Sequence, residues 1–170
     1  AAVDKVRDTG GTVCLKPGSY ALREPVRISG AGSIRVHGQG PASMIVTSGG
    51  AFIIEGSVAI AIDELAITSL GQAPAISVRT TSGIRLQDLN VRIAGTPQAP
   101  MPAIALAGVV NEITIARNAL TAPYGISALD ASDPKAPDFL VTGMLTIEDN
   151  AFACRHGAVS LDGPVFHYYA

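Results

Sequence analysis

A histidine near one end of the sequence and the acidic residues before it are the best candidates for acid–base chemistry. Arg155 and His156 precede a short apolar segment, and Asp138 lies in an earlier stretch rich in aspartate and proline. An imidazole titrates near neutral pH, so a carboxylate within hydrogen-bond reach would complete an acid–base pair. His156, Arg155 and Asp138 are therefore our catalytic candidates. The more ordinary interpretation of His156 is a solvated histidine beside a turn.

Three further residues are candidates for binding on the same rim. Tyr124 also precedes a segment of alternating apolar residues, while Asp130 and Asp133 share the polar stretch that contains Asp138. We expect Tyr124, Asp130 and Asp133 to gather with His156 around one bound molecule if this rim has a function.

Acidic residues also recur on predicted tight turns, where carboxylate oxygens could hold a calcium ion. They are Asp63-Glu64, Asp88 and Glu148-Asp149. We favour solvated turns, because these residues lie away from the strands expected to form a binding face. The three histidines are not close to one another in sequence or in the predicted register, so a histidine-based metal site is not expected. We expect no metal and no cofactor.

Short repeats must position these residues. Within each repeat, apolar residues alternate with small or polar ones, which is the period of a strand. Strands of three to five residues cannot bury their apolar side alone, so the copies must stack in successive coils. One motif reads Ile60-Ala-Ile62, Ile84-Arg-Leu86, Ile113-Thr-Ile115 and Leu145-Thr-Ile147, and a second reads Ala75-Ile-Ser-Val78, Ala103-Ile-Ala-Leu106, Gly125-Ile-Ser-Ala128 and Ala158-Val-Ser-Leu161.

The copies of each motif are unequally spaced, which disfavours leucine-rich repeats and propeller blades. Unequal spacing suits coils that share strands and differ in their loops. Two stretches account for most of the variation, Ala94 to Pro102 and Leu129 to Thr142, and we expect both to leave the stack.

A polar turn recurs in each coil and is followed by Leu65, Leu89, Asn118 or Asn150. We expect Asn118 and Asn150 to stack with their amides paired between coils, because an inward amide needs partners for its donors and acceptors. Arg117 then falls between Asp88 and Asp149 on adjacent coils. These three residues predict a structural ion-pair ladder rather than a catalytic site.

The pattern indicates an all-β fold, a single-stranded parallel β-helix of about seven irregular coils that forms one domain over residues 1–170. Residues Ala1 to Arg7 could form a short capping helix that ends at Gly10-Gly11 and covers the open end of the stack. Early strands are predicted at Thr12 to Leu15, Val26 to Ile28, Ile34 to Val36 and Met44 to Val46.

The composition argues against some classes of binding partner. The net charge is −2 and no run of Lys or Arg occurs, so we expect no nucleic-acid partner. No apolar stretch approaches the ~20 residues of a membrane span, and no signal segment opens the chain. Because Ala1 stands in place of an initiator Met, we expect a processed product or an excised piece of a longer protein, with flanking domains. Cys14 and Cys154 should lie more than ~20 Å apart in this register, too far for a disulfide.

Two segments carry a family resemblance. Gly10-Gly-Thr-Val-Cys-Leu-Lys-Pro-Gly-Ser-Tyr20 resembles the opening coil of the pectin lyase-like superfamily, and Ile34-Arg-Val-His-Gly-Gln-Gly-Pro41 resembles its next coil. The resemblance implies a right-handed β-helix. It implies less about function, because this superfamily includes polysaccharide lyases, glycoside hydrolases, epimerases, phage tail proteins, adhesins and other bacterial proteins.

The resemblance also implies that the second motif forms the floor of a groove. Ile76, Val78, Ile104, Leu106, Ile126 and Val159 would then point inward, and Ser77, Ala105, Ser127 and Ser160 outward. We expect that floor to lack an acid, a base or a cation, whereas sugar hydrolysis usually takes two carboxylates. The family's polygalacturonase signatures are absent apart from part of one in Arg155-His156-Gly157.

Two hypotheses follow. The first is a non-catalytic module, a rigid structural or recognition domain of a larger bacterial or phage-type protein that could bind polysaccharide. The second is a polysaccharide lyase or glycoside hydrolase with its site on the 129–142 insertion, and only a lyase would call for calcium. A secreted or cell-surface location fits either, but no segment of the sequence indicates a compartment.

Overall fold

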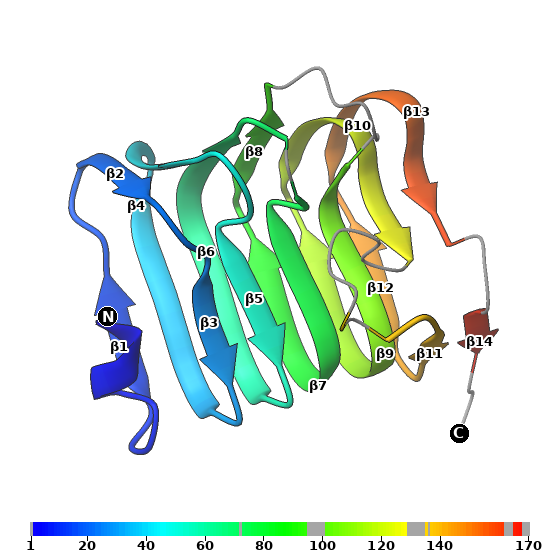
Figure 1. Ribbon diagram of the computed structural model, residues 1–170, viewed down its shortest axis with the longest axis horizontal. Coiled ribbons are helices and arrows are strands. Elements are labelled where there is room, and N and C mark those ends of the chain that lie inside the picture. Colours follow the sequence, from blue (N-terminus) through cyan, green and yellow to red (C-terminus); the bar gives the residue numbers. More distant parts are fainter. Residues whose placement is uncertain are drawn as a thin grey trace.

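The computed structural model describes residues 2–71, 73–94, 101–128, 135 and 137–161, together with the backbone of 165–167. The chain forms a parallel β-solenoid (Figure 1). All of the strand pairings among the described residues are parallel. The elements are η1 (Val3–Lys5), β1 (Gly11–Cys14), β2 (Gly18–Leu22), β3 (Val26–Ser29), β4 (Gly32–Thr47), β5 (Phe52–Glu55), β6 (Val58–Ser69), β7 (Ile76–Gln87), β8 (Asn90–Ile93), β9 (Pro102–Ala116), β10 (Ala119–Ala128), β11 (Leu140–Thr142), β12 (Leu145–Glu148), β13 (Ala151–Ser160) and β14 (Val165–His167).

Register divides the strands into three faces. The floor face contains β3, β5, the first parts of β7 and β9, and the last parts of β10 and β13. The back face contains β1, the first parts of β4 and β6, the second parts of β7 and β9, and β12. The third face contains β2, the ends of β4 and β6, β8, and the first parts of β10 and β13.

Two of the three corners carry columns of residues with positive φ, two columns between the floor and back faces and one column between the back and third faces. Such a residue redirects the chain within one step, so backbone pairing to the next coil continues almost without a gap on either side. This explains why β4, β6 and β9 extend over 16, 12 and 15 residues, although we predicted strands of three to five. The corner columns are Gly30, Gly56, Thr80 and Gly108, then Ser33, Ala59, Gly83 and Glu112, and finally Glu64, Asp88, Arg117 and Asp149.

The core lies inside the coils and is built from aligned aliphatic columns. On the back face, Ile62 pairs with Leu86, which pairs with Ile115. All three side chains are buried. Ile113 likewise pairs with Ile84 and with Leu145, as the first motif predicted. Full burial of one such side chain is worth roughly 1.5–3 kcal/mol, and every inner position of a coil repeats this gain.

The solenoid makes about four turns rather than the about seven that we predicted. The coils that run without a long interruption cover 26–47, 52–69, 76–93 and 102–122. Among the described residues, 2–22 before them contribute no strand to the floor face, and residues 124–154 after them cross all three faces but are interrupted by the second insertion. At the N-terminal end, the predicted capping helix is reduced to the 3-10 turn η1, whose Val3 is buried in the core.

The second insertion is shorter than predicted, because its end belongs to the stack. We expected Leu129 to Thr142 to leave the coils, yet β11 pairs with β9 and Leu140 is buried in the core. Leu140 and Val141 are aliphatic, and they continue the stack by pairing with β9, as the other strands pair with theirs. The rest of that insertion, apart from residues 135 and 137–139, lies outside the described residues, as do residues 95–100 of the first.

Both cysteines are free. Cys14 lies on β1 and Cys154 on β13, at opposite ends of the solenoid (Figure 1), as the predicted register requires. Among the described residues no helix is long and apolar enough to cross a membrane.

Candidate functional sites

The outer side of the floor face is covered where β7 and β9 form it. Ser77 and Ala105 were predicted to face a groove, but they are only 3% and 0% exposed, and Ala107 is buried as well. Ser127 and Ser160 are half-buried. Residues 137–139 approach this face where the backbone N–H of Gly108 donates to the carbonyl oxygen of Phe139 at 2.6 Å. The predicted floor is therefore buried over β7 and β9, while its outward residues Arg27 and Ser29 on β3 and Glu55 on β5 are exposed.

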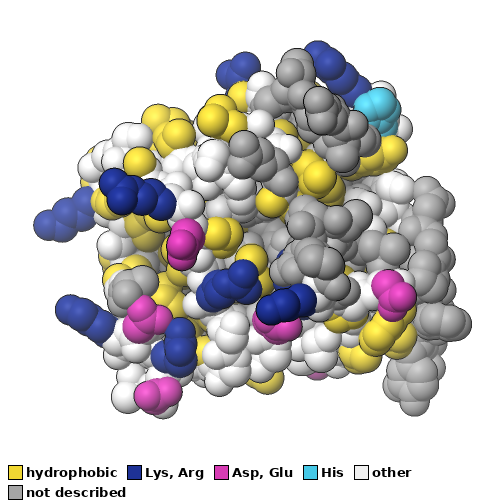
Figure 2. All heavy atoms as spheres, viewed as in Figure 1, with side chains coloured by type: hydrophobic (Ala, Val, Ile, Leu, Met, Phe, Trp, Pro, Cys, Tyr) yellow, Lys and Arg dark blue, Asp and Glu magenta, His cyan; other side chains and the backbone are white. Residues whose placement is uncertain are grey.

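The expectation that this floor lacks charged groups was wrong. Glu55 on β5 pairs in register with Arg79 on β7, and the alternation of each strand turns both side chains away from the core. Arg79 is only 3% exposed. We missed Arg79 because we ended the second motif at Val78, one residue before the charge. Basic and acidic side chains are interspersed over the face that Figure 2 shows.

Val159 differs from the other predicted inward residues of the floor. It pairs with Ile126 in the expected register, yet it is 42% exposed. β13 pairs with β10 along one edge, and among the described residues no strand pairs with its other edge. In the part of the chain that the structure describes, no following strand covers this side chain.

Part of the predicted rim site comes together. The rings of Tyr124 and His156 lie 5.3 Å apart between centroids, tilted by 33°, because Tyr124 of β10 pairs with Gly157 of β13. Arg155 and His156 are exposed and Tyr124 is half-buried. Tyr124 and His156 can therefore present one aromatic surface to solvent.

Asp138 lies elsewhere. It precedes Phe139, whose carbonyl meets Gly108, whereas Tyr124 pairs with Pro102 at the start of β9. Pro102 begins the floor part of β9 and Gly108 ends it. Asp138 lies near Gly108 and His156 lies near Pro102, so the two residues are toward opposite ends of the floor face. Asp138 is exposed. Asp130 and Asp133 lie outside the described residues, so their predicted role stays a prediction.

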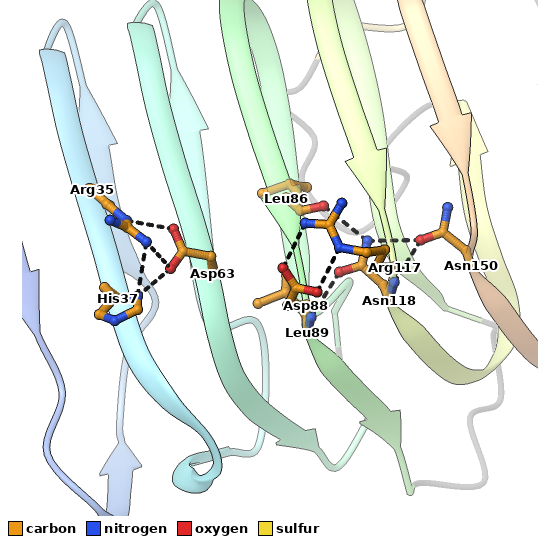
Figure 3. A network of polar contacts seen from close by, with 9 residues as sticks. All are labelled: Arg35, His37, Asp63, Leu86, Asp88, Leu89, Arg117, Asn118 and Asn150. Atoms are coloured by element: carbon orange, nitrogen blue, oxygen red, sulfur yellow. Dashed lines mark hydrogen bonds and ion pairs between the residues drawn. The ribbon is translucent and has the colours of Figure 1, made fainter.

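The asparagine ladder forms as predicted (Figure 3). The amide nitrogen of Asn118 donates to Asn150 Oδ1 and to the carbonyl of Leu86, both at 2.9 Å. Asn118 Oδ1 accepts from the backbone N–H of Leu89 at 2.9 Å, and Asn150 Nδ2 donates to the carbonyl of Ile115 at 2.8 Å. Asn118 is 2% exposed. These amides satisfy corner backbone groups inside the stack.

The ion-pair ladder forms on one side of Arg117. Its Nε and Nη2 donate to Asp88 Oδ1 and Oδ2 at 2.9 and 2.8 Å, a bidentate pair across adjacent coils. Hydrogen bonding to Asp88 and its charge, with a smaller attraction from Asp149, raise the pKa of Arg117 above its ordinary value. Asp149 thus acts on Arg117 through space, without a direct pair.

A second polar cluster lies on the outer side of the back face, nearer the N-terminal end (Figure 3). Arg35 and His37 project from β4, and Asp63 projects from β6 in register with His37. Arg35 Nε donates to Asp63 Oδ2 at 2.7 Å and Nη2 to Oδ1 at 2.9 Å. His37 Nδ1 is in direct contact with Asp63 Oδ1. We call Arg35, His37, Asp63 and the adjacent Glu64 the back-face cluster.

Asp63 is the centre of the back-face cluster. Its burial by itself would raise the pKa of this carboxyl, but hydrogen bonds from Arg35 and His37 and their charges outweigh burial, so the pKa of Asp63 is lowered. The hydrogen bond to Asp63 and its charge raise the pKa of Arg35. Asp63 therefore stays ionised at neutral pH, held between two nitrogen donors.

We did not predict the back-face cluster, because we began the repeat register at Ile60. A signal was present in the sequence: Ile34-Arg-Val36 has the same alternation as Ile60-Ala-Ile62. Extending the register by that one coil aligns His37 with Asp63, as the strand pairing does.

No family model, curated protein or solved structure matches this chain. The class that the structure defines is the parallel β-solenoid.

Proposed function

We propose that this chain is a non-catalytic β-helix module, a rigid structural or recognition domain of a larger bacterial or phage-type protein. We also propose that it belongs to the pectin lyase-like superfamily, with the right-handed coil of that family. One observation carries the functional proposal: the outer side of the floor face is buried at Ser77, Arg79 and Ala105. In the family that the sequence resembles, this is the face that meets substrate.

Rigidity follows from the way the coils are joined. Continuous ladders of hydrogen bonds and aligned aliphatic columns connect each coil to the next, and the Asn118–Asn150 amides add bonds at a corner. Each coil contacts mainly its neighbours, so the stack resists bending along its whole length. Such a body suits a spacer, or a platform that holds flanking domains apart.

Recognition would use the rim rather than the floor. Tyr124 and His156 present adjacent rings near exposed Arg155, and an aromatic face beside a cation suits an acidic sugar. Polysaccharide is therefore the partner class that we propose for a recognition role.

Incubation with a panel of acidic and neutral polysaccharides, with and without calcium, tests this proposal. We expect no new unsaturated or reducing ends, and at most weak binding that His156→Ala reduces and Arg92→Ala, an exposed strand control, does not. Turnover that His156→Ala abolishes would overturn the proposal and favour the alternative, a polysaccharide lyase or glycoside hydrolase with its site on the 129–142 insertion.

A further inference from the structure

Side chains of the types that bind metals lie in one row across the back face. Cys14 of β1 pairs with His37 of β4, and His37 pairs with Asp63 of β6. Residues in register on parallel strands project to the same side, about 4.8 Å apart. Glu64 follows Asp63 at the corner, and the ligand atoms of His37, Asp63 and Glu64 all lie within 4.8 Å of one another. A nitrogen and two carboxylates thus share one small area, and the Cys14 thiol, which is not part of that compact group, lies one strand away on the same side.

We propose that His37, Asp63 and Glu64 bind a divalent cation of the zinc class, with the Cys14 thiolate as the fourth ligand. The proposal concerns the back face and is independent of any role of the rim.

The donor set selects the metal class. Imidazole nitrogen and thiolate sulfur are ligands that zinc and its neighbours prefer, whereas calcium takes six to eight oxygen ligands. Four protein donors of this kind match the tetrahedral coordination of structural zinc sites. With the His37 imidazole neutral, as a metal ligand must be, Asp63 and Glu64 carry two negative charges against the single positive charge of Arg35, so the cluster attracts a cation even before the thiol ionises.

Arg35 is a positioning residue for this site. It holds both oxygens of Asp63 by hydrogen bonds of 2.7 and 2.9 Å, which fixes the plane of the carboxylate. A carboxylate has about four lone-pair positions, so oxygens held by Arg35 can still coordinate a metal. Ligating carboxylates are commonly oriented by hydrogen bonds in this way. The metal would displace the proton between His37 and Asp63, and that proton would go to solvent.

A bound ion would tie successive coils together. Its ligands come from β1, β4 and β6, which are neighbours in the strand order near the N-terminal end. Because β1 is the edge strand of that order, the metal would add a cross-link where the stack has a neighbour on only one side.

Zinc titration of the full chain, free of any affinity tag and treated first with chelator, tests the site. We expect one zinc ion per chain by calorimetry and a rise in melting temperature, with calcium unable to compete. His37→Gln and Glu64→Gln should each weaken zinc binding by at least about tenfold. Glu64 is exposed, so its variant should keep the fold, which circular dichroism checks.

Asp149→Asn is the matched control, because Asp149 occupies the same positive-φ corner as Glu64, at a φ of 53° in both. It should bind zinc as the unmodified chain does. Zinc binding that is absent, or equal in His37→Gln, Glu64→Gln and the unmodified chain, would overturn the proposal.

Cobalt substitution tests the fourth ligand. We expect visible bands of tetrahedral intensity and a thiolate-to-cobalt charge-transfer band that Cys14→Ser removes. An octahedral spectrum without that charge-transfer band would overturn the role of Cys14. Cobalt binding that is lost in Cys14→Ser but unaffected by His37→Gln would overturn the site as a whole, since a lone thiol would explain it.

Discussion

Two polar groups of residues bridge successive coils, and they differ in what they connect. The Asn118–Asn150 ladder points into the stack and bonds to backbone groups at a corner. The back-face cluster points outward and joins side chains to one another. An inward amide supplies the hydrogen bonds that water would otherwise make to the backbone, and it becomes part of the core. An outward cluster keeps its charges within reach of solvent and of ligands. Stability is therefore placed inside the coils and chemistry on their outer side.

The largest loss of stability that this comparison predicts comes from removing the inward amide of Asn118. Asn118→Ala leaves the N–H of Leu89 and the carbonyl of Leu86 without the partner that the amide provides, in a buried setting. Unsatisfied buried groups cost ~1–3 kcal/mol each, so we expect a loss of about 3 kcal/mol in the free energy of unfolding. Urea denaturation measures it. Asn90→Ala, at an exposed strand position, is the control, and equal losses in the two variants would contradict the contrast.

A smaller loss is expected in the back-face cluster. Asp63→Asn removes the charge that holds Arg35 and His37, but solvent screens these pairs through the two partners, whose side chains are 51% and 28% exposed. We expect a loss of about 1 kcal/mol after that discount, measured by urea denaturation with chelator present so that no metal contributes. Asp149→Asn should change stability less. A loss as large as that of Asn118→Ala would show that outward and inward groups contribute alike.

A still smaller effect is expected for the outward ion pair beside the ladder. Arg117→Gln breaks a bidentate contact with Asp88, but both side chains are exposed, 49% and 40%. Exposed pairs contribute little and are screened by salt. Melting curves at low and high ionic strength should show a small drop in melting temperature at low salt that vanishes at high salt. A drop in melting temperature that persists at high salt would show that this ion pair contributes to stability as the amides do.

The two thiols extend the comparison to the two ends of the solenoid. Cys14 is exposed, while Cys154 is half-buried and burial raises the pKa of its thiol. Fewer Cys154 thiolates exist near neutral pH, so alkylation should modify Cys14 first, and labelling of Cys154 should accelerate as pH rises. Peptide mass spectrometry over a time course measures both rates. Faster labelling of Cys154 at neutral pH would indicate that the C-terminal end opens readily.

Much of the fold was predictable because its information is local and periodic. Alternation in Ile84-Arg-Leu86 and Ile113-Thr-Ile115 predicts strands, and the repetition of such motifs predicts a stack, which the register confirms. The amide pairing of Asn118 with Asn150 followed from the same register and is confirmed by the hydrogen bonds. Errors arose in the number of turns, because the first coil is incomplete and a later one is interrupted by the second insertion, and at Arg79, because a motif was ended one residue early.

The sequence by itself determined that this chain forms stacked parallel strands, because burying an alternating apolar side requires a neighbouring copy. Only the tertiary structure decided that the floor face is covered, that Asp138 is separated from His156, and that Arg35, His37 and Asp63 meet. The reason is physical: periodicity assigns residues to the inside or the outside of a coil, but side chains 26 or more residues apart come into contact through coil length and corner position, which loops of unequal length conceal.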